Sequence, residues 1–144
     1  MISPVKEAAA YKCVEYLKEI IPTASIVDTF LLYSGQLEFD LAQSNRLLRC
    51  HTNCYVIYEF WYCIQEDPER VAEIAQYFRE RTEPVTYQFL QDKWAGLKDH
   101  YVRAAVFFLL NVCSEDGYVS SGKLNLRQYN PIMLNRIKHC SFEN

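Results

Sequence analysis

The chain has 144 residues, of which 50% are hydrophobic, 15% aromatic and 23% charged, and its formal net charge is -3. This composition excludes a disordered chain and indicates a single domain with enough residues to bury a core without disulfide or metal support. The acidic balance is not typical of a protein that binds DNA through phosphate contacts alone. No apolar run approaches the length of a membrane span, and the first residues do not form a basic segment followed by an apolar one. We therefore expect an intracellular protein without a membrane anchor.

The first half of the chain predicts one helix followed by two strands. Ser3 is a candidate helix cap, Pro4 suits a first helical turn, and apolar residues recur at helical spacing until Pro22 ends the pattern. Residues 25–30 are short and β-branched and lie between turn-forming residues, which predicts a buried strand. Residues 47–50 predict a second strand.

A helical region follows. Residues 53–65 are apolar almost all the way round, with Glu59 as the only charge, which predicts a helix buried on several sides or covered by a partner. Three further helices are predicted: one capped by Asp67, one that begins near Pro84, and a central core helix over 101–113.

The last part of the chain changes composition. Residues 114–130 are rich in Gly, Ser, Asn and Asp and predict an exposed loop. A short helix over 131–139 and a terminal strand over 140–143 complete the expected elements. The fold class is therefore α/β and helix-rich, with a small sheet of two or three strands packed by about five helices.

Four segments in chain order carry a resemblance: SPVKEAAAYKCVEYLKEIIP, IVDTFLLYSGQLEFDLA, HTNCYVIYEFWYCIQEDPERV and YVRAAVFFLLNVCSEDGYVSSGKLNLRQYNP. Together they resemble the amino-terminal part of the Dam-type DNA adenine methyltransferases of bacteria and phages, over nearly the whole chain. The resemblance implies a partial Rossmann-like methyltransferase fold in one domain, 1–144. Residues 1–66 would be the cofactor-binding part, 67–130 a helical part like the DNA-recognition region, and 131–144 a return to the sheet.

The positions that match the family's cofactor site have changed. The family binds S-adenosylmethionine, and its glycines let the cofactor approach a strand-to-helix turn closely. After Phe30, this chain has Leu32 and Ser34 in that turn, and His51 stands before Asn53 where the family has an acidic residue that binds the cofactor ribose. A leucine side chain takes up space, and a neutral imidazole offers fewer acceptors than a carboxylate. We therefore expect these five positions to form a degenerate site that binds no cofactor.

Two other features of the family are missing. The family's glycine-rich turn with a lysine matches residues 8–12, which read Ala-Ala-Ala-Tyr-Lys and favour a helix. No Asp-Pro-Pro-Tyr, the motif that holds the flipped adenine, occurs before the chain ends at Asn144. The resemblance therefore implies a pseudoenzyme, with no catalytic residue.

Cysteine and histidine offer one candidate metal site. Cys50, His51 and Cys54, with Cys63 further on, are potential zinc ligands. The spacing lacks a second Cys-x-x-Cys pair, and Cys54 and Cys63 lie in an apolar segment. We therefore expect no metal, and interpret the cysteines as buried free thiols.

Two surfaces are candidates for contacts with partners. A weak nucleic-acid surface consists of Lys123, Arg127, Tyr129 and Arg136. Acidic neighbours favour a solvated loop there instead. A weak protein interface consists of Tyr55, Tyr58, Trp61 and Tyr62, for which a place in the core is about equally favoured.

Three functions follow from these observations. The first is a non-catalytic methyltransferase-like phage protein that acts through contacts with itself or another chain, in the host cytoplasm or as a virion component. The second is one part of a split adenine methyltransferase, which would bind S-adenosylmethionine once its partner is present. The third is a DNA-binding or decoy module.

Overall fold

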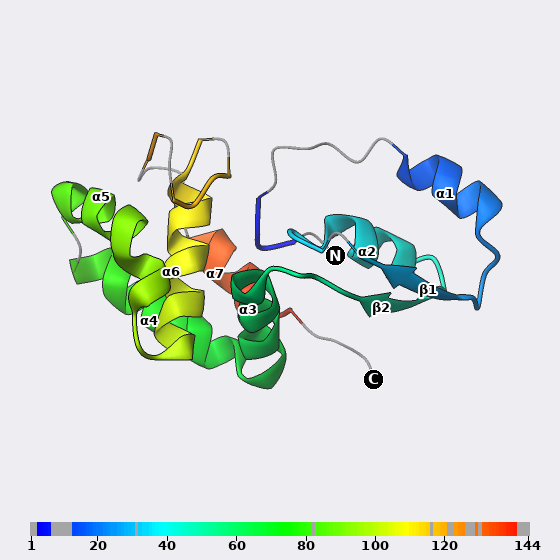
Figure 1. Ribbon diagram of the computed structural model, residues 1–144, viewed down its shortest axis with the longest axis horizontal. Helices are drawn as coiled ribbons and strands as arrows, with labels where there is room; N and C mark the ends of the chain where they lie inside the picture. Colours follow the sequence, from blue (N-terminus) through cyan, green and yellow to red (C-terminus); the bar gives the residue numbers. More distant parts are fainter. Residues whose placement is uncertain are drawn as a thin grey trace.

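The computed structural model describes residues 3–6, 13–30, 32–81, 83–115, 117–120, 123–125, 129 and 131–140. Figure 1 shows two parts: helices α3 to α7 gather on one side, and α1, α2 and a small sheet lie on the other. The elements in chain order are α1 (Val14–Ile20), β1 (Ile26–Thr29), α2 (Gln36–Ala42), β2 (Leu47–Cys50), α3 (Tyr55–Glu66), α4 (Pro68–Arg81), α5 (Pro84–Lys93), the 3-10 helix η1 (Trp94–Gly96), α6 (His100–Cys113) and α7 (Pro131–Lys138).

The sheet consists of two parallel strands joined by α2. Ile26 pairs with Leu47, and Thr29 pairs with Cys50. Both strands are confirmed, but the expectation that β1 is buried is wrong. Helix α2 packs on one face of the sheet only, and the other face leaves Ile26 and Leu47 exposed.

Helix α2 has no counterpart among the predicted elements. It follows Gly35, whose φ of 74° lies in the left-handed region that glycine adopts without strain. A Cβ on Gly35 would lie 3.2 Å from an atom of the Trp61 ring, so the turn also allows close packing on α3. Leu37 and Leu41 are four residues apart and therefore lie on the same side of α2. Leu41 is buried, so this side of the helix faces the interior.

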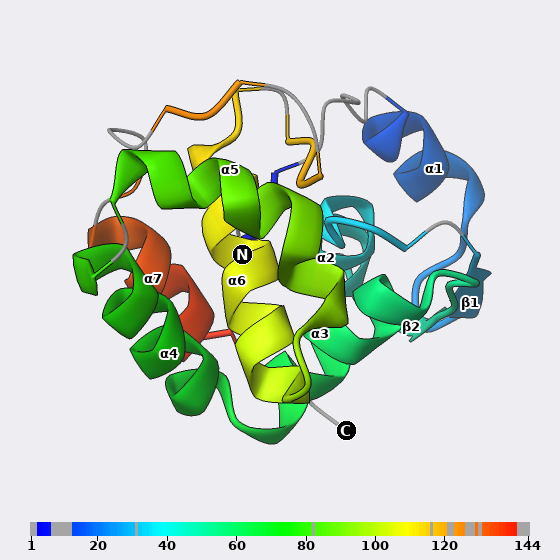
Figure 2. The ribbon, with the colours of Figure 1, turned by 60° about the vertical axis from the view of Figure 1, so that its left-hand side comes forward.

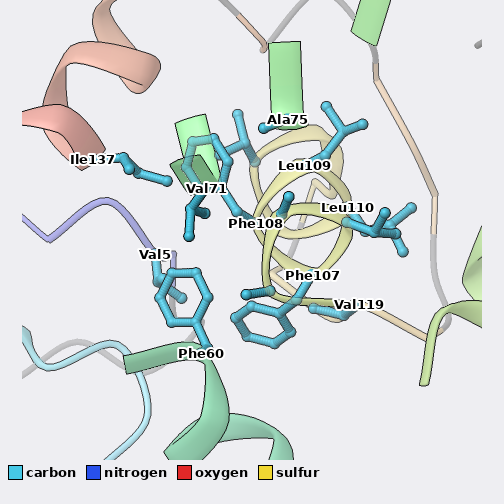
Figure 3. Packing of buried hydrophobic residues seen from close by; sticks show 14 of the residues in the cluster. Val5, Phe60, Val71, Ala75, Phe107, Phe108, Leu109, Leu110, Val119 and Ile137 are labelled. Atoms are coloured by element: carbon cyan, nitrogen blue, oxygen red, sulfur yellow. The ribbon is translucent and has the colours of Figure 1, made fainter. Parts of the chain in front are cut away.

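The core surrounds α6, as predicted. Asp99 caps this helix by accepting a hydrogen bond from the Val102 amide at 3.0 Å, and every residue from 104 to 113 is buried. Helices α3, α4 and α5 pack against it, and Figure 2 shows α6 running through the middle of this helical part. In Figure 3, Val5 and Ile137 join the same cluster from distant parts of the chain. Burial of such side chains, at about 1.5–3 kcal/mol each, is the main stabilising term.

The predicted start of the first helix is wrong. Residues 3–6 are not helical, and the first described helical residue is Val14; residues 7–12 lie outside the described part. The Ser3 hydroxyl donates to the Ser34 carbonyl, and the Lys6 amide donates to Asn111 Oδ1 at 2.6 Å. Long-range contacts therefore replace the local cap that the Ser-Pro pattern favours.

The loop after α6 is less exposed than its composition predicts. Ser114 forms an antiparallel bridge with Leu124, Val119 is buried, and Trp94 Nε1 donates to Ser120 Oγ at 2.9 Å. Helix α7 is confirmed, whereas the predicted strand over 140–143 lies outside the described residues beyond buried Cys140. The described ranges thus contain a helix-rich α/β fold with seven α-helices, more than the five expected. None of these helices has the length and apolar character needed to span a bilayer.

Candidate functional site

The carboxyl ends of β1 and β2 bring two of the predicted positions together. The rings of Phe30 and His51 stack with their centroids 4.9 Å apart, and His51 Nε2 lies 2.9 Å from Asp28 Oδ1. Arg49 Nη2 also donates to Asp28 Oδ2 at 2.9 Å. The hydrogen bonds from His51 and Arg49 lower the pKa of the Asp28 carboxyl. This is an exposed, charged cluster on the open face of the sheet.

Two of the other predicted positions, Leu32 and Ser34, lie in the turn between β1 and α2, whereas Asn53 lies between β2 and α3. Leu32 is partly buried and packs against the hydrophobic core. Ser34 is buried and accepts from Ser3. Asn53 is exposed just before α3.

The chain's own groups occupy the surroundings of this turn. The Trp61 indole donates to the Tyr33 carbonyl at 2.8 Å, and its ring lies against Gly35. The Ser3 amide donates to Gln36 Oε1 at 2.8 Å, at the first residue of α2. In open α/β sheets, ligands bind beside such strand-to-helix turns. In this chain, the Trp61 side chain and the segment that begins at Ser3 occupy the space beside the turn, on the sides of the turn that they contact.

The cysteines divide into two groups, which corrects the expectation that all are buried. Cys63, Cys113 and Cys140 are buried, whereas Cys13, Cys50 and Cys54 are exposed, and all six are free thiols. Burial raises the pKa of the Cys63 thiol to about 11. No group of three or more His, Cys, Asp and Glu side chains in the described ranges is placed to hold a metal ion.

Three predicted interface residues form an exposed row on α3, which we call the tyrosine row: Tyr55, Tyr58 and Tyr62. Neighbouring ring centroids are 6.5 Å and 6.1 Å apart. Trp61, in contrast, is buried against Phe39 and belongs to the interior. The spacing of three and four residues explains this division, because it places the tyrosines on one side of the helix and Trp61 on another.

An ion pair that the sequence analysis does not predict lies close to the row. Both guanidinium donors Nε and Nη2 of Arg103 reach the Glu59 carboxylate at 2.7 Å. Hydrogen bonds from Arg103 and then from Tyr55 lower the pKa of Glu59 against the opposing effect of burial. The sequence contains a signal for this ion pair, because Glu59 is the only charged residue in 53–65 and Arg103 is the only Lys, Arg, Asp or Glu in α6.

The described residues of the predicted nucleic-acid surface lie in three different segments. Lys123 is exposed, with Nζ 3.9 Å from Glu115 Oε1. The Tyr129 hydroxyl donates to Gln76 Oε1 at 3.1 Å, so this ring faces α4. Arg136 lies on α7 with Nη1 3.5 Å from Met133 Sδ, and Arg127 lies outside the described residues.

Comparison with known proteins gives no family for this chain: no family model matches it, and no curated protein matches it. The functional argument therefore depends on the residues and their geometry.

Proposed function

We propose that this chain is a non-catalytic, methyltransferase-like protein that acts through protein–protein contacts. The most specific form of this proposal is that the chain is a structural component of a phage particle. The parallel β1–α2–β2 unit supports the resemblance to the Dam-type family, because such a unit is the building block of Rossmann-like folds. The degenerate positions in that unit support the loss of methyl transfer.

The tyrosine row carries this proposal. Tyr55, Tyr58 and Tyr62 expose three neighbouring rings on the helix whose other sides enter the core. Tyrosine is enriched at protein interfaces, since its ring supplies apolar area at a small cost in side-chain entropy. An exposed row of this kind favours a protein partner, and we take a second copy of the chain as that partner.

A second exposed surface, partly apolar and partly charged, supports the same function. The open face of the sheet exposes Ile26 and Leu47 beside the Asp28–Arg49 pair, and Phe30, directly after β1, is 68% exposed. Parallel sheets in proteins are normally covered on both faces. Among the described residues only α2 covers this sheet, on one face, which favours burial of the other face against another chain.

Sedimentation of the purified chain over a range of concentrations tests this function. We expect association that depends on concentration, and we expect the double substitution Tyr58→Ser with Tyr62→Ser to shift the chain to monomer. Loss of two interface aromatic residues typically costs several kcal/mol of binding, about 2 kcal/mol for each hot-spot residue.

Tyr77→Ser is the matched control. Tyr77 is exposed on α4, away from the row along the sequence, and packs under the Arg81 guanidinium at 4.0 Å. We expect its removal to leave association unchanged. A wild-type chain that stays monomeric at every concentration, or equal effects of the row and control substitutions, would contradict self-association through the tyrosine row.

A further inference from the structure

The open face of the sheet, on the side away from α2, has its side chains arranged in pairs across the two strands (Figure 1). Alternate residues of a strand point to the same face of a sheet. On this face they are exposed, whereas Val27 and Leu48 between them are half-buried. Three cross-strand pairs make up the open face: Ile26 with Leu47, Asp28 with Arg49, and Phe30 with His51 just beyond the strands.

The middle pair places opposite charges on the two strands. Arg49 Nε and Nη2 donate to the Asp28 carboxylate at 3.1 Å and 2.9 Å. The Asp28 and Arg49 side chains remain 36% and 64% exposed. Both charged groups are therefore accessible to a second partner as well as to each other.

This arrangement is complementary to itself. Consider two copies that pack face to face, with a two-fold axis that runs between the sheets and along the strands. Strand β1 of one copy then lies over β2 of the other, in the same direction. The parallel register places Ile26 over Leu47, Asp28 over Arg49, and Phe30 over His51 of the second copy. Sheets that pack face to face in proteins keep their strands within about 30° of this alignment.

The other two-fold arrangement of these faces is unfavourable. An axis that runs across the strands places β1 over β1, so that Asp28 faces Asp28 and Arg49 faces Arg49. Like charges in an interface oppose association. Charge complementarity therefore selects the axis along the strands.

We propose that the open face binds the open face of a second copy of this chain, with Asp28 of each copy against Arg49 of the other. This inference rests on the proposed function, self-association, and adds to it a second contact that is separate from the tyrosine row. Exposed ion pairs contribute little to binding, so the sheet contact is the weaker of the two. The tyrosine row forms dimers, and the sheet contact joins these dimers into larger assemblies at higher concentration.

Charge reversal on the open face tests this contact, with sedimentation of the full chain as the measurement. Asp28→Arg places Arg against Arg, and Arg49→Asp places Asp against Asp, at both symmetry-related positions. Each variant should therefore stop at the dimer. The dissociation constant of the step beyond the dimer should rise by roughly tenfold or more.

An equal mixture of the two variants gives the sharper test. In a mixed contact, the two arginines of Asp28→Arg face the two aspartates of Arg49→Asp, so the mixture should form assemblies larger than the dimer. Recovery of this kind also shows that both variants are folded. Glu80→Arg and Arg81→Asp are the matched controls, because they reverse the charges of an exposed pair on α4 in the same way. Each control alone should assemble as the wild type does.

The results separate this inference from the proposed function. A wild-type chain that never exceeds the dimer, charge variants that assemble as far as the wild type, or a mixture that stays dimeric would overturn the sheet contact and leave the tyrosine row intact. Charge variants that are monomeric alone and dimeric when mixed would support the sheet contact and contradict association through the tyrosine row.

Discussion

At the scale of single residues, the Glu59–Arg103 pair best shows how charge is tolerated inside this protein. The two side chains are 6% and 18% exposed, so both are largely removed from water. Arg103 Nη1 also donates to the Lys98 carbonyl at 3.0 Å, which provides further compensation for its desolvation. A buried charge that keeps its partner is tolerated, whereas the same charge alone is strongly destabilising.

Glu59→Gln should therefore lower the free energy of unfolding by about 3 kcal/mol, the lower end of the cost of breaking a buried pair. Urea unfolding at neutral pH measures the loss. Glu66→Gln, an exposed residue on the same helix, should change the free energy by less than about 0.5 kcal/mol. Equal losses in the two variants would show that the ion pair contributes nothing specific.

The same pair gives the stability a dependence on pH. The pKa of Glu59 is lowered from 4.5 in the folded chain, so its carboxylate stabilises the fold fully above the unfolded value. This contribution is lost as the pH falls from 4.5 through the lower folded pKa. The difference between wild type and Glu59→Gln should shrink over that acidic range, and a difference that grows there would contradict the assignment.

At the scale of elements, local sequence patterns predict most of the helices and both strands. Asp67 before α4 and Asp99 before α6 each accept a hydrogen bond from an amide three residues on, at 3.1 Å and 3.0 Å. Only the first of these caps was predicted, because the periodic apolar residues of α6 suggest a start at Tyr101. Patterns of this kind depend on residues close in sequence, which is why they succeed.

The elements that were missed depend on distant contacts. The segment from Ser3 to Lys6 has a helix-start pattern but bonds to Ser34 and Asn111 instead. Helix α2 is short, and the packing of Trp61 on Gly35 supports it from α3. Periodicity in one short segment cannot reveal such partners.

Gly35→Ala should test the strand-to-helix turn. The left-handed φ strains any side chain, and the added Cβ would press on the Trp61 ring at 3.2 Å, so we expect a loss of about 1–2 kcal/mol in the free energy of unfolding. Gly96→Ala is the control, because a Cβ there meets nothing within 4 Å. Thermal unfolding of both variants measures the difference, and an equal Tm would count against a packed turn.

At the scale of the whole molecule, the part of the chain that the structure describes combines a well-packed helical part with a small sheet that α2 covers on one face. The core links Val5, the helices around α6, and Cys140, so residues from the predicted cofactor-binding part and the predicted helical part share one interior. The exposed tyrosine row and the open sheet face are the surfaces that a partner would bury.

The candidate site was only partly predictable at this scale. Phe30 and His51 meet because parallel strands end at the same edge, which sequence order implies once the strands are placed. The inward turn of Leu32 and the burial of Trp61 depend on packing between distant helices.

Calorimetric titration of the full chain with S-adenosylmethionine is the most direct test of the claim that methyl transfer has been lost. With Trp61 against Gly35 and Ser3 bonded to Ser34 and Gln36 around the turn, we expect no saturable heat of binding and no change in Tm. Saturable binding of one S-adenosylmethionine per chain would contradict the account.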